Sequence, residues 1–116
     1  MKKYHPESTS LVIDDIRTYE GVVHARTSAE GIKMLVDYKW DYVLLDHDLG
    51  GDDTIKPVVH WLKAESASNP WANPYLLLIT ANPVGMQWIA DTLRGQYAMN
   101  KFPGGLVPGY KILKNV

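Results

Sequence analysis

The sequence predicts an α/β three-layer sandwich with a mainly parallel sheet of about five strands. Short apolar runs without an amphipathic stripe occur at residues 11–13, 42–45 and 75–80. Such runs are typical of strands that are covered on both faces, as in the middle of a parallel sheet. Patterns of helical period alternate with them at a spacing that suits crossover connections.

The composition is that of one ordinary globular domain. Of the 116 residues, 46% are hydrophobic and 22% are charged, which argues against disorder. We expect a single domain over residues 1–116, with its core at about 10–100 and an irregular segment at 101–116. The net charge of −1 argues against broad binding of duplex nucleic acid, which requires a basic surface. The absence of cysteine excludes disulfides and thiolate metal sites.

Neither a membrane-spanning segment nor a signal peptide is predicted. No apolar run approaches the ~20 residues that a spanning helix needs. The first residues lack the apolar core of a signal peptide. We therefore expect a cytoplasmic protein without a membrane partner.

The first predicted connection is unusual. Residues 21–26 are typical of a strand, yet only about five residues separate them from the strand at 11–13, too few for a helical crossover. This second strand is expected either to pair antiparallel with the first or to lie at the sheet edge after a wide turn. In both cases the first crossover helix is missing.

Two helices are predicted in the middle of the chain. Thr27 and Glu30 have the spacing of a capping box, and a helix follows at about 28–38. Apolar residues then recur at helical intervals up to about residue 66, with Asp53 or Thr54 as the N-cap.

A third helix is predicted after the strand at 75–80. Asn82 and Pro83 fit the N-cap and the first helical position, and Gly95 fits a stop. Residues 97–99 are the candidate for a fifth strand.

Acidic residues gather where two of the strands end. In open α/β sheets, ligands bind outside the carboxyl ends of the strands. If the crossovers are right-handed, these ends share one edge, where several polar side chains could converge. They are Asp14, Asp15, Asp46, Asp48, Thr80 and Asn82.

Converging carboxylates need a cation or protons, because like charges a few Å apart cannot all stay ionised. A hard cation with oxygen ligands, Mg²⁺ or Mn²⁺, suits a chain without cysteine. Thr80 and the N–H groups near Asn82 would then donate to phosphate oxygens at a helix N-terminus. The simpler alternative is that these aspartates only end strands and cap turns.

Three residues near this edge keep alternative interpretations. His47 is a candidate general acid or base, a third metal ligand, or a turn histidine bonded to a carboxylate. Asp46 is either a nucleophile or only a metal ligand. Arg17 either clamps phosphate or is a solvated surface arginine.

Three motifs resemble the receiver domain of two-component response regulators: residues 11–15, 43–46 and 78–81. The resemblance implies a flavodoxin-like fold with strand order 2-1-3-4-5. It also implies roles for individual residues. Asp46 matches the phosphoacceptor, Asp14 and Asp15 match the acidic pair at Mg²⁺, the backbone carbonyl of Asp48 matches a metal ligand, and Thr80 matches the hydroxyl at the phosphoryl group. The lysine of that family has only Lys101 as a candidate.

The missing helix, and His47 and Asp48 after the acceptor, depart from ordinary receivers. The strings at 14–17, 45–50 and 82–85 look more like the receiver-derived group called cyclic-phosphate processing receiver domains. That resemblance implies metal-dependent processing of a phosphate ester by a phosphoesterase. The expected substrate is a cyclic phosphate on a small molecule or an RNA end.

Two alternatives accompany this expectation. The chain is either a stand-alone receiver phosphorylated on Asp46, or a non-catalytic module with a protein partner, of the kind encoded by phages or mobile elements. The oligomeric state stays open.

Overall fold

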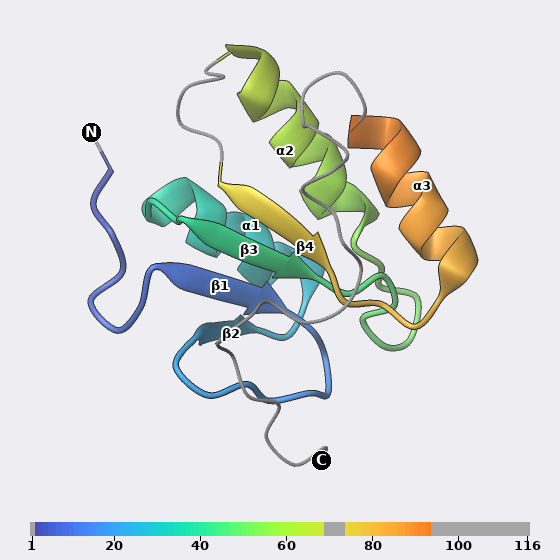
Figure 1. Ribbon diagram of the computed structural model, residues 1–116, viewed down its shortest axis with the longest axis horizontal. Coiled ribbons are helices and arrows are strands. Elements are labelled where there is room, and N and C mark those ends of the chain that lie inside the picture. Colours follow the sequence, from blue (N-terminus) through green and yellow to red (C-terminus); the bar gives the residue numbers. More distant parts are fainter. Residues whose placement is uncertain (1, 69–73, 94–116) are drawn as a thin grey trace.

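The computed structural model describes residues 2–68 and 74–93 of the chain. Its strands are β1 (Ser10–Ile13), β2 (Val23–Ala25), β3 (Tyr42–Leu45) and β4 (Tyr75–Leu78). Its helices are α1 (Ser28–Asp37), α2 (Lys56–Ser68) and α3 (Pro83–Leu93). All four strands are parallel and lie in the order β2-β1-β3-β4 (Figure 1). The predicted α/β fold with a parallel sheet is therefore confirmed.

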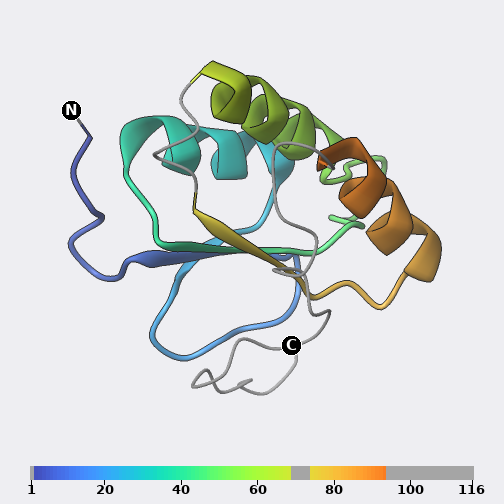
Figure 2. The same cartoon turned by 45° about the horizontal axis from the view of Figure 1, so that its top comes forward.

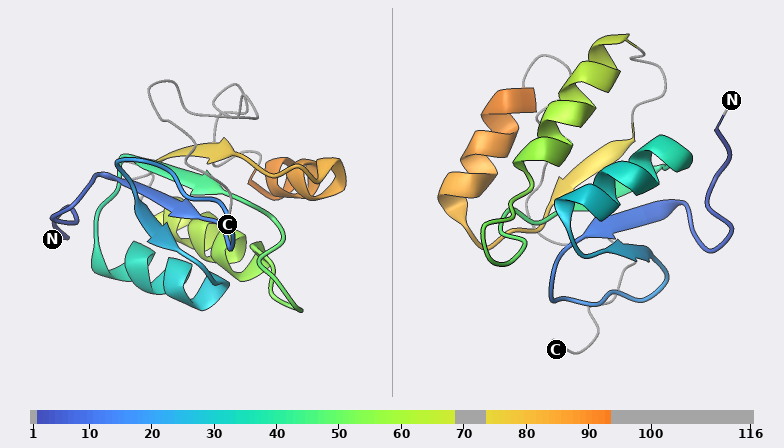
Figure 3. Two further views of the ribbon diagram at one scale, coloured as in Figure 1. Left: turned by 90° about the horizontal axis from the view of Figure 1, so that it is seen from below. Right: turned by 180° about the vertical axis from the view of Figure 1, so that it is seen from behind.

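The apolar runs form the strands because each is buried on both faces. One set of strand side chains, which includes Ile13 and Leu45, packs with all three helices. The alternate set, which includes Val12 and Leu44, packs on the opposite face with Tyr19. In the described ranges the helices thus form one layer on one face (Figures 2 and 3). Tyr19 and its loop lie on the other face.

The predicted N-caps of α1 and α3 are confirmed. Thr27 Oγ1 accepts a hydrogen bond of 3.1 Å from Glu30 N–H at the start of α1. Asn82 Oδ1 accepts one of 3.0 Å from Gly85 N–H at the start of α3. Among the described residues, no helix is long and apolar enough to cross a membrane.

The β1–β2 connection corrects one sequence prediction. β2 pairs parallel with β1, with Leu11 opposite Val23, so the antiparallel alternative was wrong and the edge position was right. Residues 14–22 contain no helix and make the wide turn that this pairing needs. Arg26 holds the turn in place, because its Nη1 donates to Asp14 O at 3.1 Å and to Arg17 O at 2.7 Å.

Several sequence predictions lie outside the described residues. They concern the stop at Gly95, the strand at 97–99, Lys101 and the segment 101–116.

The loop before α2 also corrects the expected role of Asp53. Thr54 Oγ1 accepts a 3.3 Å hydrogen bond from Lys56 N–H at the start of α2. Asp53 instead bonds to the first residue of α1, with Ser28 N–H at 2.8 Å and Ser28 Oγ at 2.5 Å. One carboxylate therefore joins the loop after β3 to the N-terminus of α1, where backbone N–H groups have no helical acceptor.

We expect Asp53→Ala to lower the free energy of unfolding by about 1 kcal/mol, the usual cost of losing a helix cap. Urea unfolding measures this change. The matched control is Asp52→Ala at the exposed neighbouring position, which should change stability by less than about 0.5 kcal/mol. Equal effects of the two variants would contradict the assigned role of Asp53.

Candidate functional site

The acidic edge is an extension of the sheet. Hydrogen bonds continue one residue past the strands, from Asp46 N–H to Ile13 O at 3.0 Å and from Ile79 N–H to Leu45 O at 3.0 Å. Asp14 N–H similarly donates to Ala25 O at 3.1 Å. The backbone next to the site is therefore held in register by the same pairing that forms the sheet.

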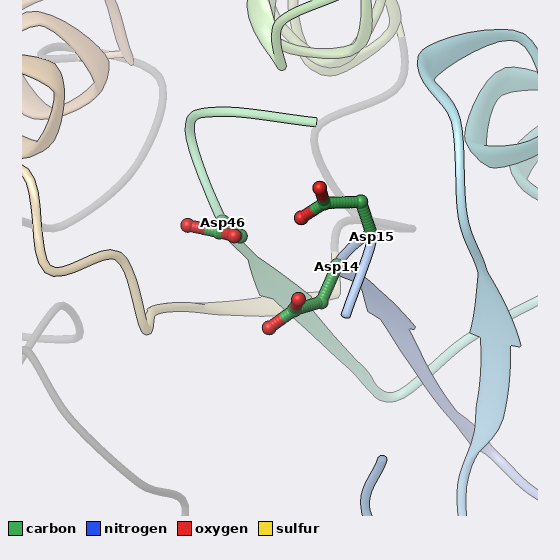
Figure 4. A group of neighbouring side chains, drawn as sticks. All are labelled: Asp14, Asp15 and Asp46. Carbon is green, nitrogen blue, oxygen red and sulfur yellow. The ribbon is translucent and has the colours of Figure 1, made fainter. Parts of the chain in front are cut away.

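Three of the predicted metal ligands come together at this edge. Asp14 and Asp15 extend from the end of β1, and Asp46 extends from the end of the neighbouring β3 (Figure 4). One carboxylate oxygen from each lies within 4.8 Å of those of the other two. Asp14 is 1% exposed and Asp46 is 9% exposed, so two of the charges are largely withdrawn from water.

The two oxygens of Asp14 have different surroundings. Oδ1 accepts hydrogen bonds from the backbone N–H groups of Ile16 and Arg17, both at 3.0 Å, which fixes the carboxylate in a tight turn. Oδ2 is buried and has no hydrogen-bond partner among the described residues. Its charged neighbour is Arg17 Nε at 3.3 Å. A buried, incompletely satisfied carboxylate oxygen is suited to a cation.

Burial, and after it the nearby charge of Asp14, raise the pKa of Asp46 to about 6. The His47 backbone N–H, the charge of Arg17 and the Thr80 hydroxyl act in the opposite direction because they stabilise the ionised carboxylate. Asp46 therefore exchanges its proton close to neutral pH. Cation binding next to it would favour the ionised form.

The glycine-rich turn after Asp46 lets the backbone approach Asp15. Gly50 has φ +89°, which side chains rarely permit. A Cβ atom at Gly50 would lie 3.2 Å from Asp15 Oδ2. Glycine at this position therefore permits the positive φ of the turn and leaves space for the Asp15 carboxylate.

Thr80 and Asn82 lie after β4 and are already hydrogen-bonded. Thr80 is 6% exposed, contacts Asp46 through its hydroxyl, and accepts Asn82 N–H at 3.0 Å. Asn82 caps α3 through Oδ1, and its Nδ2 donates to Asp48 Oδ2 at 3.3 Å. Thr80 thus faces the acidic group, whereas the Asn82 side chain connects α3 to the loop after β3.

His47 lies apart from the three carboxylates and is not in the ligand group found in the described part of the chain. Its ring packs under α3, where a Cβ atom on Gly85 would lie 2.5 Å from His47 Cγ. Its edge also meets Trp88, with 6.4 Å between ring centroids. Nδ1 lies 3.0 Å from Asp48 Oδ1. This is the arrangement of a histidine bonded to a neighbouring carboxylate.

The Asp48 side chain points to His47 and Asn82 and does not join the group of three carboxylates. Its backbone lies opposite Thr54 in an isolated antiparallel bridge. The two hydrogen bonds around that bridge use His47 O and Leu49 N–H, so neither uses the Asp48 carbonyl.

Tyr19 is a neighbour of the site that sequence reasoning missed. It is 1% exposed, and within the described ranges its hydroxyl makes no well-formed hydrogen bond, although the Arg17 side chain lies close enough to stabilise its ionised form. Burial raises the pKa of this hydroxyl, on which the charges of Arg17, Asp14 and Asp46 also act. A lone aromatic in a loop without periodicity gives no sequence signal, and in the structure Tyr19 packs on the sheet face next to the acidic edge.

Comparison with known families gives one match. The family model described as "Cyclic-phosphate processing Receiver domain" matches residues 9–95. The chain belongs to the cyclic-phosphate processing receiver domain family. No curated protein gives a significant match to the chain.

The matched range of this receiver domain contains all four strands and the three carboxylates. Lys101, the candidate for the lysine of ordinary receivers, lies beyond it. The donor set fits a hard divalent cation, since it consists of carboxylate oxygens, one of which is buried without a hydrogen bond.

The raised pKa of Asp46 predicts how the stability of this receiver domain depends on pH without metal. The unfolded chain has the lower pKa, so the folded protein binds the extra proton between about pH 4 and 6. This contribution to stability is complete below about pH 4 and is lost as the pH rises through about 6.

We therefore expect Asp46→Asn, measured by urea unfolding with a chelator present, to be more stable than the native chain by about 1–2 kcal/mol at pH 8. The difference should vanish at pH 4, where the native carboxyl is also neutral. Asp52→Asn, at an exposed position, is the control for loss of one negative charge. A variant less stable than the native chain at pH 8 would contradict the assigned burial cost.

Proposed function

We propose that this receiver domain binds Mg²⁺ or Mn²⁺ through Asp14, Asp15 and Asp46 and acts as a phosphoesterase on a phosphate ester. The expected substrate is a cyclic phosphate on a nucleotide or an RNA end, in keeping with the family's description. The observation that carries the proposal is the group of three carboxylates within 4.8 Å.

The charge of the group supports this proposal. Two of the three carboxylates are buried. Repulsion between carboxylates at this distance is relieved when one of them binds a proton or when the group binds a cation. When bound, a divalent cation neutralises phosphate charge and polarises a phosphoryl oxygen or a water molecule.

The chain's own residues divide the remaining tasks. Asp46 either holds the cation or attacks phosphorus, and the loss of its proton near pH 6 makes both roles available at neutral pH. The Thr80 hydroxyl beside Asp46 is positioned to donate to a phosphate oxygen. The backbone carbonyl of Asp48 is a further candidate ligand of the cation.

His47 stays the candidate general acid or base. Asp48 orients its ring through Nδ1, which leaves Nε2 for proton transfer. Because the ring lies under α3, a substrate would have to reach the side of the site next to Gly85. Asn82 would act by holding Asp48 and α3, and a direct contact with phosphate is secondary.

A small phosphorylated molecule suits the overall charge better than duplex nucleic acid, since the net charge is −1. We expect the protein to act in the cytoplasm. A protein partner remains part of the alternative in which the domain acts through surface contacts.

Calorimetry with Mn²⁺ and Mg²⁺ tests the metal site. We expect Asp14→Asn and Asp46→Ala to lose at least about tenfold in affinity, because each removes a charged ligand. Asp48→Asn is the matched control, since its side chain lies outside the group, and it should retain binding. Absence of binding by the native chain at millimolar metal would exclude the proposal.

Turnover is tested next with 2′,3′-cyclic nucleotides in the presence of the metal that binds. Native activity that is lost in Asp46→Ala and lowered in Thr80→Ala would support phosphoesterase function. If the protein binds metal but turns over no cyclic phosphate, the metal site stands and the proposed reaction is excluded.

Phosphorylation of Asp46 is the second candidate, and the hydrogen bond between Thr80 and Asp46 favours it. This candidate predicts that a small phosphodonor adds one phosphoryl group to the native chain and none to Asp46→Ala. Intact-protein mass spectrometry measures the addition. An unlabelled native chain that binds metal would exclude it.

A further inference from the structure

Arg17 lies inside the acidic edge and does not extend freely into solvent. Its side chain is 26% exposed, and Nε lies 3.3 Å from Asp14 Oδ2. At the other end of the guanidinium, Nη2 donates to Ile79 O at 3.0 Å, just past β4. The side chain therefore connects the ends of β1 and β4 across the site.

This placement differs from both sequence interpretations of Arg17. A surface arginine would have no fixed partner, and a phosphate clamp would present its planar fork outward. Here one edge of the guanidinium faces a carboxylate and another donor is occupied by a backbone carbonyl. The positive charge of Arg17 therefore offsets the negative charge of Asp14.

Arg17 faces the Asp14 oxygen whose hydrogen-bonding capacity is not satisfied within the described residues. Asp14 Oδ1 already accepts two backbone N–H groups, whereas the buried Oδ2 accepts no hydrogen bond from the part of the chain that the structure describes. Arg17 Nε approaches Oδ2 at ion-pair distance without a hydrogen bond. Such a contact neutralises charge and is weaker than a bidentate pair, so it can be exchanged.

The backbone of Arg17 is held independently of its side chain. Its N–H donates to Asp14 Oδ1 at 3.0 Å, and its carbonyl accepts Arg26 Nη1 at 2.7 Å. The guanidinium can therefore leave Asp14 without unfolding the loop.

We propose that Arg17 is the built-in counter-cation of the acidic site, which neutralises Asp14 in the metal-free protein and gives up Asp14 Oδ2 when a divalent cation binds. This inference rests on the proposed metal site. Arg17 is a positioning residue, and it lowers the affinity for metal because the two cations compete for one oxygen.

The test is calorimetry with Mn²⁺ on the full chain at fixed ionic strength. Arg17→Gln removes the charge, and we expect its dissociation constant to fall roughly tenfold below that of the native chain after allowing for solvent screening. Arg17→Lys keeps the charge without the fork, so its affinity should lie between the two.

Lys33→Gln is the control for net charge. Lys33 is exposed on α1 and pairs with Asp37 at 2.9 Å, so its loss should change the dissociation constant by less than about twofold. A change as large as that of Arg17→Gln would show a general charge effect and overturn the inference.

A second readout follows the guanidinium itself. The Nε–H resonance of Arg17, assigned by its absence in Arg17→Lys, should shift when Mg²⁺ is added to the native chain. An unshifted resonance at saturating Mg²⁺ would show that Arg17 keeps its contact and would overturn the inference. This measurement needs no variant to bind metal, so it decides the matter even if Arg17→Gln does not fold.

The two proposals fail in different ways. Metal binding by the native chain with equal or weaker binding by Arg17→Gln refutes the counter-cation and leaves the metal site. No binding by either protein refutes the metal site itself.

Discussion

The parallel register between β1 and β3 is the constraint on which the site depends. Ile13 lies opposite Leu45, and the ladder continues by one hydrogen bond, so Asp14 and Asp46 leave adjacent strands at the same level. A shift of one residue would turn one carboxylate to the other face of the sheet. Burial of the apolar strand residues on both faces enforces this register. Core packing therefore also provides the energy that holds like charges together.

The loop in place of a first helix gives this receiver domain its distinctive electrostatics. Arg26 holds the loop in place by donating hydrogen bonds to backbone carbonyls of the loop, and Tyr19 packs against the adjacent face of the sheet. Arg17 then reaches Asp14 from the same short segment. Residues 14–22 thus supply two carboxylates of the acidic group, the positive charge of Arg17 and the buried ring of Tyr19.

Much of the fold could be predicted from the sequence because its signals are local. The unbroken apolar runs predicted the strands, and Thr27 and Asn82 predicted where α1 and α3 begin. The convergence of Asp14, Asp15 and Asp46 followed from the rule that parallel strands share their carboxyl ends. The direction of β2 did not follow, because tertiary bonds from Arg26 stabilise a turn that composition does not reveal.

The details of the site could not be predicted from the sequence, because they depend on the direction in which each side chain points. Asp46 and His47 are adjacent in sequence, yet consecutive side chains at the end of a strand point to opposite faces. Asp46 accordingly meets Thr80, while His47 meets Gly85 and Trp88. The two side chains therefore have different neighbours although the residues are adjacent in the sequence. The Arg17 contact with Asp14 is likewise a product of loop geometry.

The close fit of His47 under Gly85 has a mechanical consequence. Gly85 has no side chain, so the imidazole ring of His47 packs directly against the backbone of α3 at this point. A side chain at position 85 would overlap this ring, so either the ring or α3 would have to move. A rotation of the ring would therefore change its contact with α3, where Trp88 also meets the ring at 6.4 Å between centroids.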